Sequence, residues 1–316
     1  MLPWRRPTRP VISVGNLAMG GRGKTPTVAA VAQLLVDAGE RPAILSRGYG
    51  RRAPIDDVVV VSDGTHVLAD LDRSGDEPLM LARQLAGAAV LVCDVRVTAA
   101  ALAEERYNVT VHLLDDGFQH RSLKRDIDLV LVTPADLRDR RLPLGRLRSS
   151  PSALSRAHAV LVDGVGVEAV TTALDAVAPA ARTSRYAIAR HLGDPWMIEE
   201  GRPAISRETP VVAVAAIASP DRFKQALEAG GWRVTTMLAF RDHHAFTARD
   251  VSRMAQAVID SGAQGVLTTE KDAMRLLPLR PLPVAVGAVP LRVSIEPAAE
   301  FGAWLLGTLR KVRARC

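Results

Sequence analysis

The sequence predicts an α/β protein with a doubly wound, mostly parallel β-sheet and a second, smaller α/β domain. Short runs rich in Val and Leu alternate with helical patterns along the first half of the 316-residue chain. Runs that are apolar on both faces are typical of parallel strands buried inside a sheet. Strand–helix alternation produces the doubly wound arrangement. The length is too great for one small core and suits two domains, or one large α/β unit with an appendage.

The predicted elements follow one another in a regular order. Strands are expected at residues 11–14, 43–45, 58–61, 89–93, 109–114, 129–132 and 159–162, with helices at 25–38, 77–85 and 98–107. Residues 182–209 are polar, contain prolines and show no clear period, so we expect them to connect two domains, 1–182 and 183–316. Further strands are expected at 211–217, 234–238, 266–268, 284–286 and 293–295, with helices that begin at Ser219 and Thr247 and a closing basic helix.

The charge balance favours an anionic partner. The chain carries 41 Lys and Arg against 34 Asp and Glu, a net charge of +7. Such a balance favours phosphates, nucleic acid or an anionic membrane surface without choosing among them. Only 4% of the residues are aromatic, which argues against a surface that binds single strands by stacking bases. We expect no nucleic-acid partner.

Cysteine content and hydropathy indicate the compartment. Cys93 and Cys316 are the two cysteines, which is no disulfide framework, so a reducing compartment is expected. No apolar run is long enough to span a bilayer, and the first ten residues lack the apolar core of a signal peptide. We expect a cytoplasmic protein that can still touch a membrane surface.

A glycine-rich loop follows the first predicted strand. Segment 15–25 reads GNLAMGGRGKT and leads into a predicted helix. Glycines let backbone N–H groups converge on phosphate oxygens, and the helix N-terminus adds partial positive charge. Lys24 is expected to bridge the β- and γ-phosphates of ATP, and Thr25 to give Mg²⁺ a hydroxyl ligand. The expected nucleotide-binding residues are Gly20, Gly21, Arg22, Gly23, Lys24 and Thr25.

One position departs from the usual phosphate-loop pattern. The pattern G-x-x-x-x-G-K-[ST] requires glycine at position 18, where the chain has Ala18. We expect the doubled glycine at positions 20 and 21 to compensate. The alternative interpretation is a glycine-rich turn with an incidental Lys–Thr pair, and the flanking strand and helix favour the phosphate site.

Two carboxylates end the predicted strand at 109–114. Asp115 and Asp116 lie where the carboxyl ends of parallel strands form the ligand-binding crevice of an α/β sheet. A magnesium-holding acid is expected there in a phosphate-loop protein. The alternative is an Asp–Gly turn that only ends the strand. Two adjacent carboxylates are costly without a cation nearby, so the sequence favours the magnesium site.

Two further motifs stay ambiguous when taken alone. Asp76, in the segment GDEP, fits simple helix-start chemistry. His243, in the segment DHH, could transfer a proton with help from Asp242, or belong to a capped surface loop. No Cys and His cluster has the spacing of a zinc site.

Taken together, the motifs resemble the tetraacyldisaccharide 4′-kinase family, the lipid A 4′-kinases of Gram-negative outer-membrane biogenesis. The matching segments are VISVGNLAMGGRGKTP (11–26), LSRGYG (45–50), GDEP (75–78), DDGFQHRSLKRDIDLVLV (115–132), RLPLGRLR (141–148), FRDHHAF (240–246) and TTEKDA (268–273). The phosphate loop is common to many proteins, whereas its combination with LSRGYG, GDEP and DDGFQH is much more specific.

The resemblance implies a reaction and its residues. MgATP would phosphorylate the 4′-hydroxyl of tetraacyldisaccharide 1-phosphate. Asp76 and His243 would form the acid–base pair, with the carboxylate taking the proton of the sugar hydroxyl, and the two domains would close over the site. Thr25, Asp115 and Asp116 would be linked to magnesium. Asn16, Gln119, His120 and Arg148 are expected to bind the substrate.

The resemblance also implies peripheral contact with the cytoplasmic face of the anionic inner membrane, without an obligate protein partner. Family members usually carry an N-terminal amphipathic helix, whereas about ten residues precede the first strand here. We expect either a late start of the chain or docking through other basic surfaces, such as Arg5, Arg6 and the segment 138–148. The family often has glutamate after Arg148, where this chain has Ser149, so any role of that acid is lost or moved.

Two other functions compete with the kinase. A regulatory ATPase switch of the partitioning or division-site type also has a GG-x-GKT loop, but it typically has lysine where this chain has Met19. A metal-insertion GTPase would need a guanine-reading Asn/Thr-Lys-x-Asp segment, and Glu270 interrupts the closest match at 269–272. Both alternatives rank below the kinase.

Overall fold

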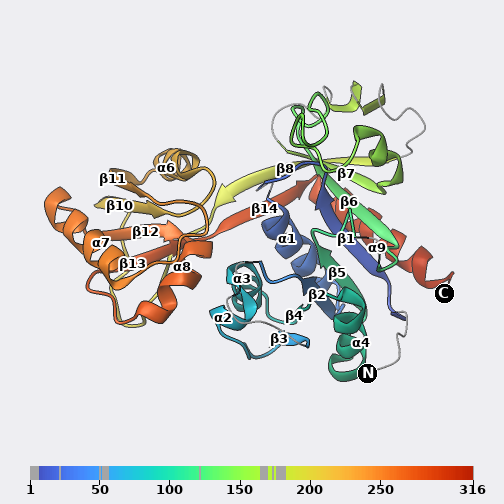
Figure 1. The fold of residues 1–316 in the computed structure, drawn as a ribbon, viewed down its shortest axis with the longest axis horizontal. Helices are drawn as coiled ribbons and strands as arrows, with labels where there is room; N and C mark the ends of the chain where they lie inside the picture. Colours follow the sequence, from blue (N-terminus) through green and yellow to red (C-terminus); the bar gives the residue numbers. More distant parts are fainter. Residues whose placement is uncertain are drawn as a thin grey trace. The chain divides into compact units, whose positions relative to one another are not determined.

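The fold consists of two compact units (Figure 1). It is a computed structural model that describes residues 7–20, 23–49, 51, 57–120, 122–163, 170–172, 174–175 and 183–315. The first unit contains Met1–Ala189 and Val293–Cys316, and the second contains Arg190–Arg292. Five residues named above lie outside the described residues: Arg5, Arg6, Gly21, Arg22 and Cys316. No helix of the described part is long and apolar enough to cross a membrane.

A nine-stranded sheet forms the first unit. Its strands are β1 (Val11–Asn16), β2 (Pro42–Ser46), β3 (Val59–Asp63), β4 (Ala89–Val92), β5 (Val111–Asp115), β6 (Ile127–Val132), β7 (Ala159–Asp163), β8 (Ser184–Leu192) and β14 (Leu291–Glu296). The strand order is β14-β8-β7-β6-β1-β5-β2-β4-β3. The strands from β8 to β4 pair in parallel, and β3 runs antiparallel to β4. The predicted doubly wound, mostly parallel sheet is confirmed.

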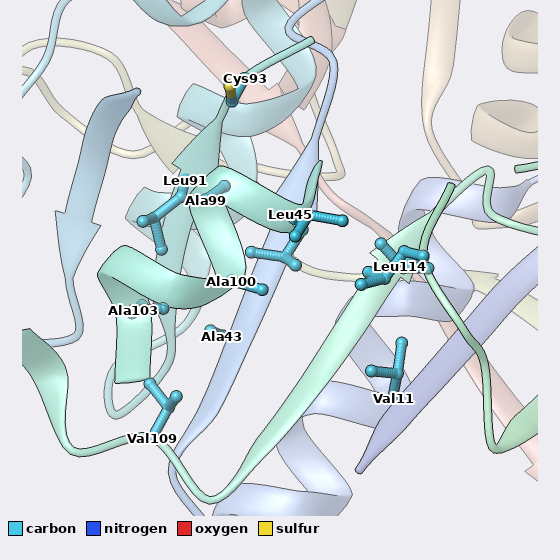
Figure 2. Close-up of a cluster of buried hydrophobic side chains, with 13 residues drawn as sticks. Val11, Ala43, Leu45, Leu91, Cys93, Ala99, Ala100, Ala103, Val109 and Leu114 are labelled. Carbon is cyan, nitrogen blue, oxygen red and sulfur yellow. The ribbon is translucent and has the colours of Figure 1, made fainter. Parts of the chain in front are cut away.

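Helices bury both faces of this sheet. They are α1 (Lys24–Asp37), α2 (Leu71–Ser74), α3 (Asp76–Gln84), α4 (Arg96–Tyr107) and α9 (Ala298–Arg313), with a 3₁₀ helix at Pro151–Arg156. Figure 2 shows Ala99, Ala100 and Ala103 of α4 packed over Ala43 and Leu45 of β2. Ile44 points to the opposite face, because side chains alternate along a strand, and it is also fully buried. Burial on both faces explains why the strands are almost continuously apolar.

Strand β1 lies between β5 and β6 in the centre of the sheet. Val14 of β1 is in register with Asp115 at the end of β5. Because all three strands are parallel, the loop after β1 and the turn after β5 leave the same edge of the sheet. The chain thereby places the glycine-rich loop beside the two carboxylates.

The second unit has its own five-stranded sheet. Its strand order is β11-β10-β12-β13-β9, built from β11 (Arg233–Ala239), β10 (Pro210–Ala215), β12 (Gly265–Thr269), β13 (Val286–Val289) and β9 (Trp196–Met197). Three α-helices, α6 (Pro220–Ala229), α7 (Ala248–Ser261) and α8 (Glu270–Leu276), and a 3₁₀ helix at Leu277–Leu279 complete it. Phe223, Leu227 and Trp232 pack against Val211 and Ala213 in its core. A capping box fixes the start of α7 at Thr247, as predicted.

The expected connection at 182–209 differs from what the structure contains. It includes β8, a strand of the first unit, and β9, a strand of the second. The charged residues of β8 hide its pattern, since only part of the strand is buried. The C-terminal strand and helix also belong to the first unit rather than to the expected domain 183–316. In α9, Phe301 is buried against Tyr186 of β8, and Arg313 donates two hydrogen bonds to Glu40.

Glu104 of α4 ties three parts of the first unit together. Its carboxylate accepts hydrogen bonds from the backbone N–H groups of Thr8 and Arg9, and it lies 2.9 Å from Nε2 of the buried His112 in β5. Burial opposes ionisation, but the hydrogen bonds from His112, Arg9 and Thr8 outweigh it and lower the pKa of Glu104 to about 2.

We predict that Glu104→Gln lowers stability at pH 7 but not at low pH. Because the folded-state pKa lies below the unfolded value of 4.5, the charged carboxylate stabilises the fold above about pH 5 and loses this effect as the pH falls towards 2. Urea unfolding of both proteins at several pH values measures the difference. A gap between wild type and variant that stays constant from pH 7 to pH 3 would contradict the role assigned to Glu104.

Candidate active site

The phosphate loop has the backbone geometry that an anion site requires. Gly20 and Gly23 have positive φ angles of 103° and 76°, which glycine adopts without strain. Gly23 is the N-cap of α1, and no side chain caps the helix there. The first N–H groups of this 14-residue helix are therefore left for a ligand to satisfy.

Ala18, where the usual pattern has glycine, fits the fold for a visible reason. Its methyl group is fully buried in an apolar cluster that includes Phe118 and Leu147. Ala18 also forms an isolated β-bridge with Leu147. The first part of the loop is thus anchored by packing, and among the described loop residues the positive φ angles occur at Gly20 and Gly23.

Close packing joins the loop to the acidic turn. A Cβ atom added at Gly15, in β1, would lie 2.5 Å from Cβ of Phe118. A Cβ atom at Gly117 would lie 2.7 Å from Oγ of Ser13. Both separations are too short for real side chains, so these glycines allow β1 and the DDGF turn to touch directly.

The turn after β5 presents its two carboxylates differently. Asp115 is buried, and its Oδ2 atom lies 3.4 Å from the Thr25 hydroxyl. Asp116 has a left-handed φ angle of 55° and accepts two hydrogen bonds from Arg148, at 2.8 and 2.6 Å. Arg148 also donates to the side-chain oxygen of Asn16 at 2.7 Å. One carboxylate therefore contacts the start of α1, while the other is clamped by an arginine.

Lys24 reaches back over its own loop. Its Nζ atom lies 3.3 Å from Oδ1 of Asn16, 3.5 Å from the Gly20 carbonyl oxygen and 3.8 Å from Oδ1 of Asp116. The predicted residues Asn16, Lys24, Thr25, Asp115, Asp116 and Arg148 thus form one connected group. Gln119 joins it by donating to the Asn16 carbonyl oxygen at 2.7 Å and to Oγ of Ser149 at 3.2 Å.

The electrostatics separate the two carboxylates further. Burial raises the pKa of Asp115 to about 7, and the charges of Glu77 and Asp116 add to this effect against Lys24 and Arg96. Burial also opposes ionisation of Asp116, but hydrogen bonds from Arg148 and the charge of Lys24 outweigh it and lower the pKa of that carboxyl. Asp116 is therefore a fixed anion, whereas Asp115 lacks enough positive charge around it.

The donor set at this edge fits Mg²⁺. The Asp115 carboxylate and the Thr25 hydroxyl are hard oxygen donors within 3.4 Å of each other. Among the described residues, no group of three or more His, Cys, Asp or Glu could hold a metal by itself. Mg²⁺ typically takes one or two carboxylates and completes its shell with water and substrate phosphates. A cation at this place would also compensate the excess negative charge near Asp115.

Asp76 lies in a tightly built corner of the same unit. A Cβ atom at Gly75, where φ is 83°, would lie 2.4 Å from the Tyr49 carbonyl oxygen, and one at Gly48 would lie 2.7 Å from that of Ser74. The segments LSRGYG and GDEP therefore touch through their glycines. Asp76 is buried as the first residue of α3, and its Oδ1 atom accepts from the N–H group of Glu77 at 2.9 Å.

His243 lies on a strained loop of the second unit. It has a positive φ angle of 58°, unusual for histidine, and its N–H group donates to the Ala216 carbonyl oxygen at 3.2 Å. Its Nε2 atom lies 3.2 Å from Nζ of Lys271 and 3.9 Å from Oδ1 of Asp242. The neighbouring His244 instead contacts Asp250 and stacks on Phe240, so it belongs to the packing of α7.

A buried ion pair, Asp272 with Arg275, contacts the backbone around the His243 loop. Asp272 of α8 is fully buried, accepts from the Ala216 N–H group at 2.9 Å and pairs with Arg275 at 3.1 Å. Arg275 in turn donates to the His244 carbonyl oxygen at 3.1 Å. Asp272, in the segment TTEKDA, thus fixes the Ala216 backbone to which the His243 N–H group donates, and Arg275, two residues after that segment, fixes the carbonyl group of His244.

Some predicted residues are not brought together here, and others were missed. Asp76 belongs to the first unit and His243 to the second, so each is described within its own unit. His120 contacts Ser122 at 2.8 Å, and burial together with Arg96 and Arg47 lowers its pKa. Glu77, Arg47 and Arg96 influence the acidic pair but were not predicted as site residues. Glu77 lies in the segment GDEP and Arg47 in the segment LSRGYG, so the motifs contained both residues without indicating a role for them, and no local pattern distinguished Arg96.

Comparisons with known proteins agree with this geometry. The family model described as "LpxK: Tetraacyldisaccharide-1-P 4'-kinase" matches residues 1–310. A tetraacyldisaccharide 4′-kinase of Anaeromyxobacter dehalogenans is 42% identical over 287 residues, which cover 88% of this chain and 75% of the relative. A second, from Syntrophus aciditrophicus, is 36% identical over 319 residues and covers 94% of this chain and 83% of its own length.

A solved structure extends the similarity to the fold. LpxK from Aquifex aeolicus, crystallised in complex with ATP, superimposes with a TM-score of 0.76 at 28% identity, covering 96% of this chain and 90% of that one. The match over nearly the whole chain sets aside the ATPase-switch and GTPase alternatives. The motifs, the geometry and the relatives agree, and the chain belongs to the tetraacyldisaccharide 4′-kinase (LpxK) family, the ATP-dependent kinases of lipid A biosynthesis.

Proposed function

We propose that this chain transfers the γ-phosphoryl group of MgATP to the 4′-hydroxyl of tetraacyldisaccharide 1-phosphate at the edge of the nine-stranded sheet where β1 and β5 end. The observation that carries the proposal is the contact between the phosphate-loop helix and the acidic turn, with Thr25 and Asp115 3.4 Å apart. A phosphate loop alone is compatible with many activities. Its direct contact with a buried carboxylate is the arrangement that MgATP requires.

The loop and its neighbours provide the nucleotide site. Lys24 donates to the β- and γ-phosphate oxygens, and backbone N–H groups at the start of α1 bind the same oxygens. Thr25 and Asp115 hold Mg²⁺, which when bound neutralises charge that builds up on the transferring phosphoryl group. Both oxygens of Asp116 accept hydrogen bonds from Arg148, so Asp116 is not proposed as a direct ligand of the metal. It contributes its negative charge from beside the metal site. Gly21 and Arg22 belong to the same loop in this proposal.

Asp76 is the proposed general base. A sugar hydroxyl is a weak nucleophile, so a carboxylate that accepts its proton as the phosphoryl group moves lowers the barrier. The buried position of Asp76 at the start of α3 fixes the direction of its oxygens, one of which binds the Glu77 N–H group. His243 is the proposed supporting group, held on its loop by Ala216 and Lys271.

The acceptor is proposed to bind next to the nucleotide through polar groups. Asn16, Gln119, His120 and Arg148 carry donors and acceptors that suit a sugar phosphate. Three of them already form one hydrogen-bonded group, since Arg148 and Gln119 both donate to Asn16. Because the acceptor is a membrane lipid, the protein is also proposed to contact the anionic inner-membrane surface peripherally.

The direct test is transfer of radiolabelled γ-phosphate from ATP to tetraacyldisaccharide 1-phosphate in detergent micelles, with and without Mg²⁺. The proposal expects a labelled lipid that forms only when lipid and Mg²⁺ are both present. Label released as free phosphate at the same rate without lipid would indicate an ATPase instead.

We predict that Lys24→Ala lowers kcat/KM for phosphoryl transfer by about 10²–10³-fold or more, the usual effect of removing one charged transition-state donor. The fold should be unaffected, because the Lys24 side chain contacts only polar groups of its own site. Lys224→Ala, on the surface of α6, is the matched control. Near wild-type transfer by Lys24→Ala would overturn the nucleotide assignment.

We predict that Asp76→Asn lowers kcat by about 10²–10⁴-fold and changes KM little, as expected for a proton-transfer group. Asp72→Asn, in the preceding helix, is the control and should retain activity. If His243 acts through Asp76, the double variant with His243→Ala should lose little more than Asp76→Asn alone. A change confined to KM in Asp76→Asn would mean that the residue only positions the substrate.

A further inference from the structure

Three large apolar side chains are exposed on two hydrogen-bonded loops of the first unit. Leu142 is 50% exposed, Leu144 is 78% exposed and Met19 is 54% exposed. The Met19 N–H group donates to the Arg146 carbonyl oxygen at 2.8 Å, which joins the phosphate loop to the loop at 140–147. We call Met19, Leu142 and Leu144 the apolar tip. Large apolar side chains exposed on adjoining loops are typical of an interaction site.

The loop that displays the tip is held in place by the fold. The N–H group of Leu142 donates to the Leu147 carbonyl oxygen, and that of Leu147 donates to the Arg140 carbonyl oxygen, both at 3.0 Å. A Cβ atom at Gly145 would lie 2.2 Å from the Arg140 carbonyl oxygen, so the turn depends on glycine. Leu147 itself is buried. An ordered loop with a buried leucine thus presents two other leucines to solvent.

Exposed arginines lie close to the tip leucines in the chain. Arg138, Arg140, Arg141 and Arg146 are all exposed. Asp139 pairs with Arg146 at 3.0 Å, and no carboxylate in the described part of the chain pairs with the other three. Exposed apolar side chains together with nearby arginines match an anionic bilayer, where apolar groups enter the headgroup boundary and arginines bind lipid phosphates.

The tip adjoins the proposed site. The backbone of Arg148, which follows the tip loop, donates to the Leu17 carbonyl oxygen at 2.7 Å, and its side chain clamps Asp116. We propose that Met19, Leu142 and Leu144 insert into the anionic membrane surface while Arg138, Arg140 and Arg141 bind its phosphates. This inference rests on the proposed function, in which the acceptor is a membrane lipid. The kinase then meets its acceptor with the acyl chains still in the bilayer and only the sugar headgroup in the site.

The test is sedimentation of the full chain with vesicles of phosphatidylethanolamine, alone or mixed with phosphatidylglycerol. The double variant Leu142→Ser with Leu144→Ser should bind the mixed vesicles at least tenfold more weakly than wild type, the order expected for two leucines withheld from the interface. Arg140→Gln with Arg141→Gln should abolish the preference for phosphatidylglycerol. Ile259→Ser, on α7, removes an equally exposed apolar side chain, 70% exposed, and should bind like wild type.

Three results would overturn the inference. One is wild-type binding of the mixed vesicles by the leucine variant, and the second is an equal loss in Ile259→Ser. Absence of vesicle binding by wild type would also overturn it and would leave a protein partner as the occupant of the tip. Phosphoryl transfer to acceptor dispersed in detergent is measured separately on the same proteins. Failure of transfer in wild type would reject the proposed function, whereas vesicle binding alone decides the role of the tip.

Discussion

The site depends on one close contact, the packing of β1 against the turn that follows β5. Gly15 leaves room for Phe118, and Gly117 leaves room for Ser13, at separations that no side chain at either glycine would permit. Together with the parallel register of Val14 and Asp115, this contact fixes where the phosphate loop and the acidic turn leave the sheet. The short distance between Thr25 and Asp115 is a consequence of it. A residue larger than glycine at position 15 would separate the loop from the carboxylates without touching either.

Asp115 and Asp116 belong to one motif in the sequence, but their side chains lie in different environments. Arg148 and Lys24 balance the negative charge of Asp116 and lower its pKa. Burial and neighbouring carboxylates instead raise the pKa of Asp115 to about 7. A carboxyl whose pKa is raised because too little positive charge lies nearby is the group whose ionised form a bound cation stabilises most. Arg148 donates hydrogen bonds to both Asn16 and Asp116. It thereby connects the phosphate loop to the loop that carries Leu142 and Leu144 of the apolar tip.

Much of the fold could be predicted because both faces of the sheet are buried, which makes a strand such as β4 continuously apolar and leaves few polar residues in β1 and β6. Strand β8 could not, since it is buried only in part and carries Arg185 and Arg190. The phosphate loop and the acidic pair followed from local patterns, but Asp76 needed a family resemblance, because a buried acid at a helix start looks like any other. Contacts between distant segments, such as Asp272 with Ala216, leave no local pattern.

Asp115 and Asp116 have different roles at this site, and the difference can be measured directly. Mn²⁺ would replace Mg²⁺ in the complex with a non-hydrolysable ATP analogue, in protein whose aspartate carboxyl carbons are labelled with ¹³C. Electron–nuclear double resonance would then report a ¹³C carboxylate bound to the metal. We predict that this coupling disappears in Asp115→Asn and persists in Asp116→Asn. A coupling that survives in Asp115→Asn but is lost in Asp116→Asn would contradict it.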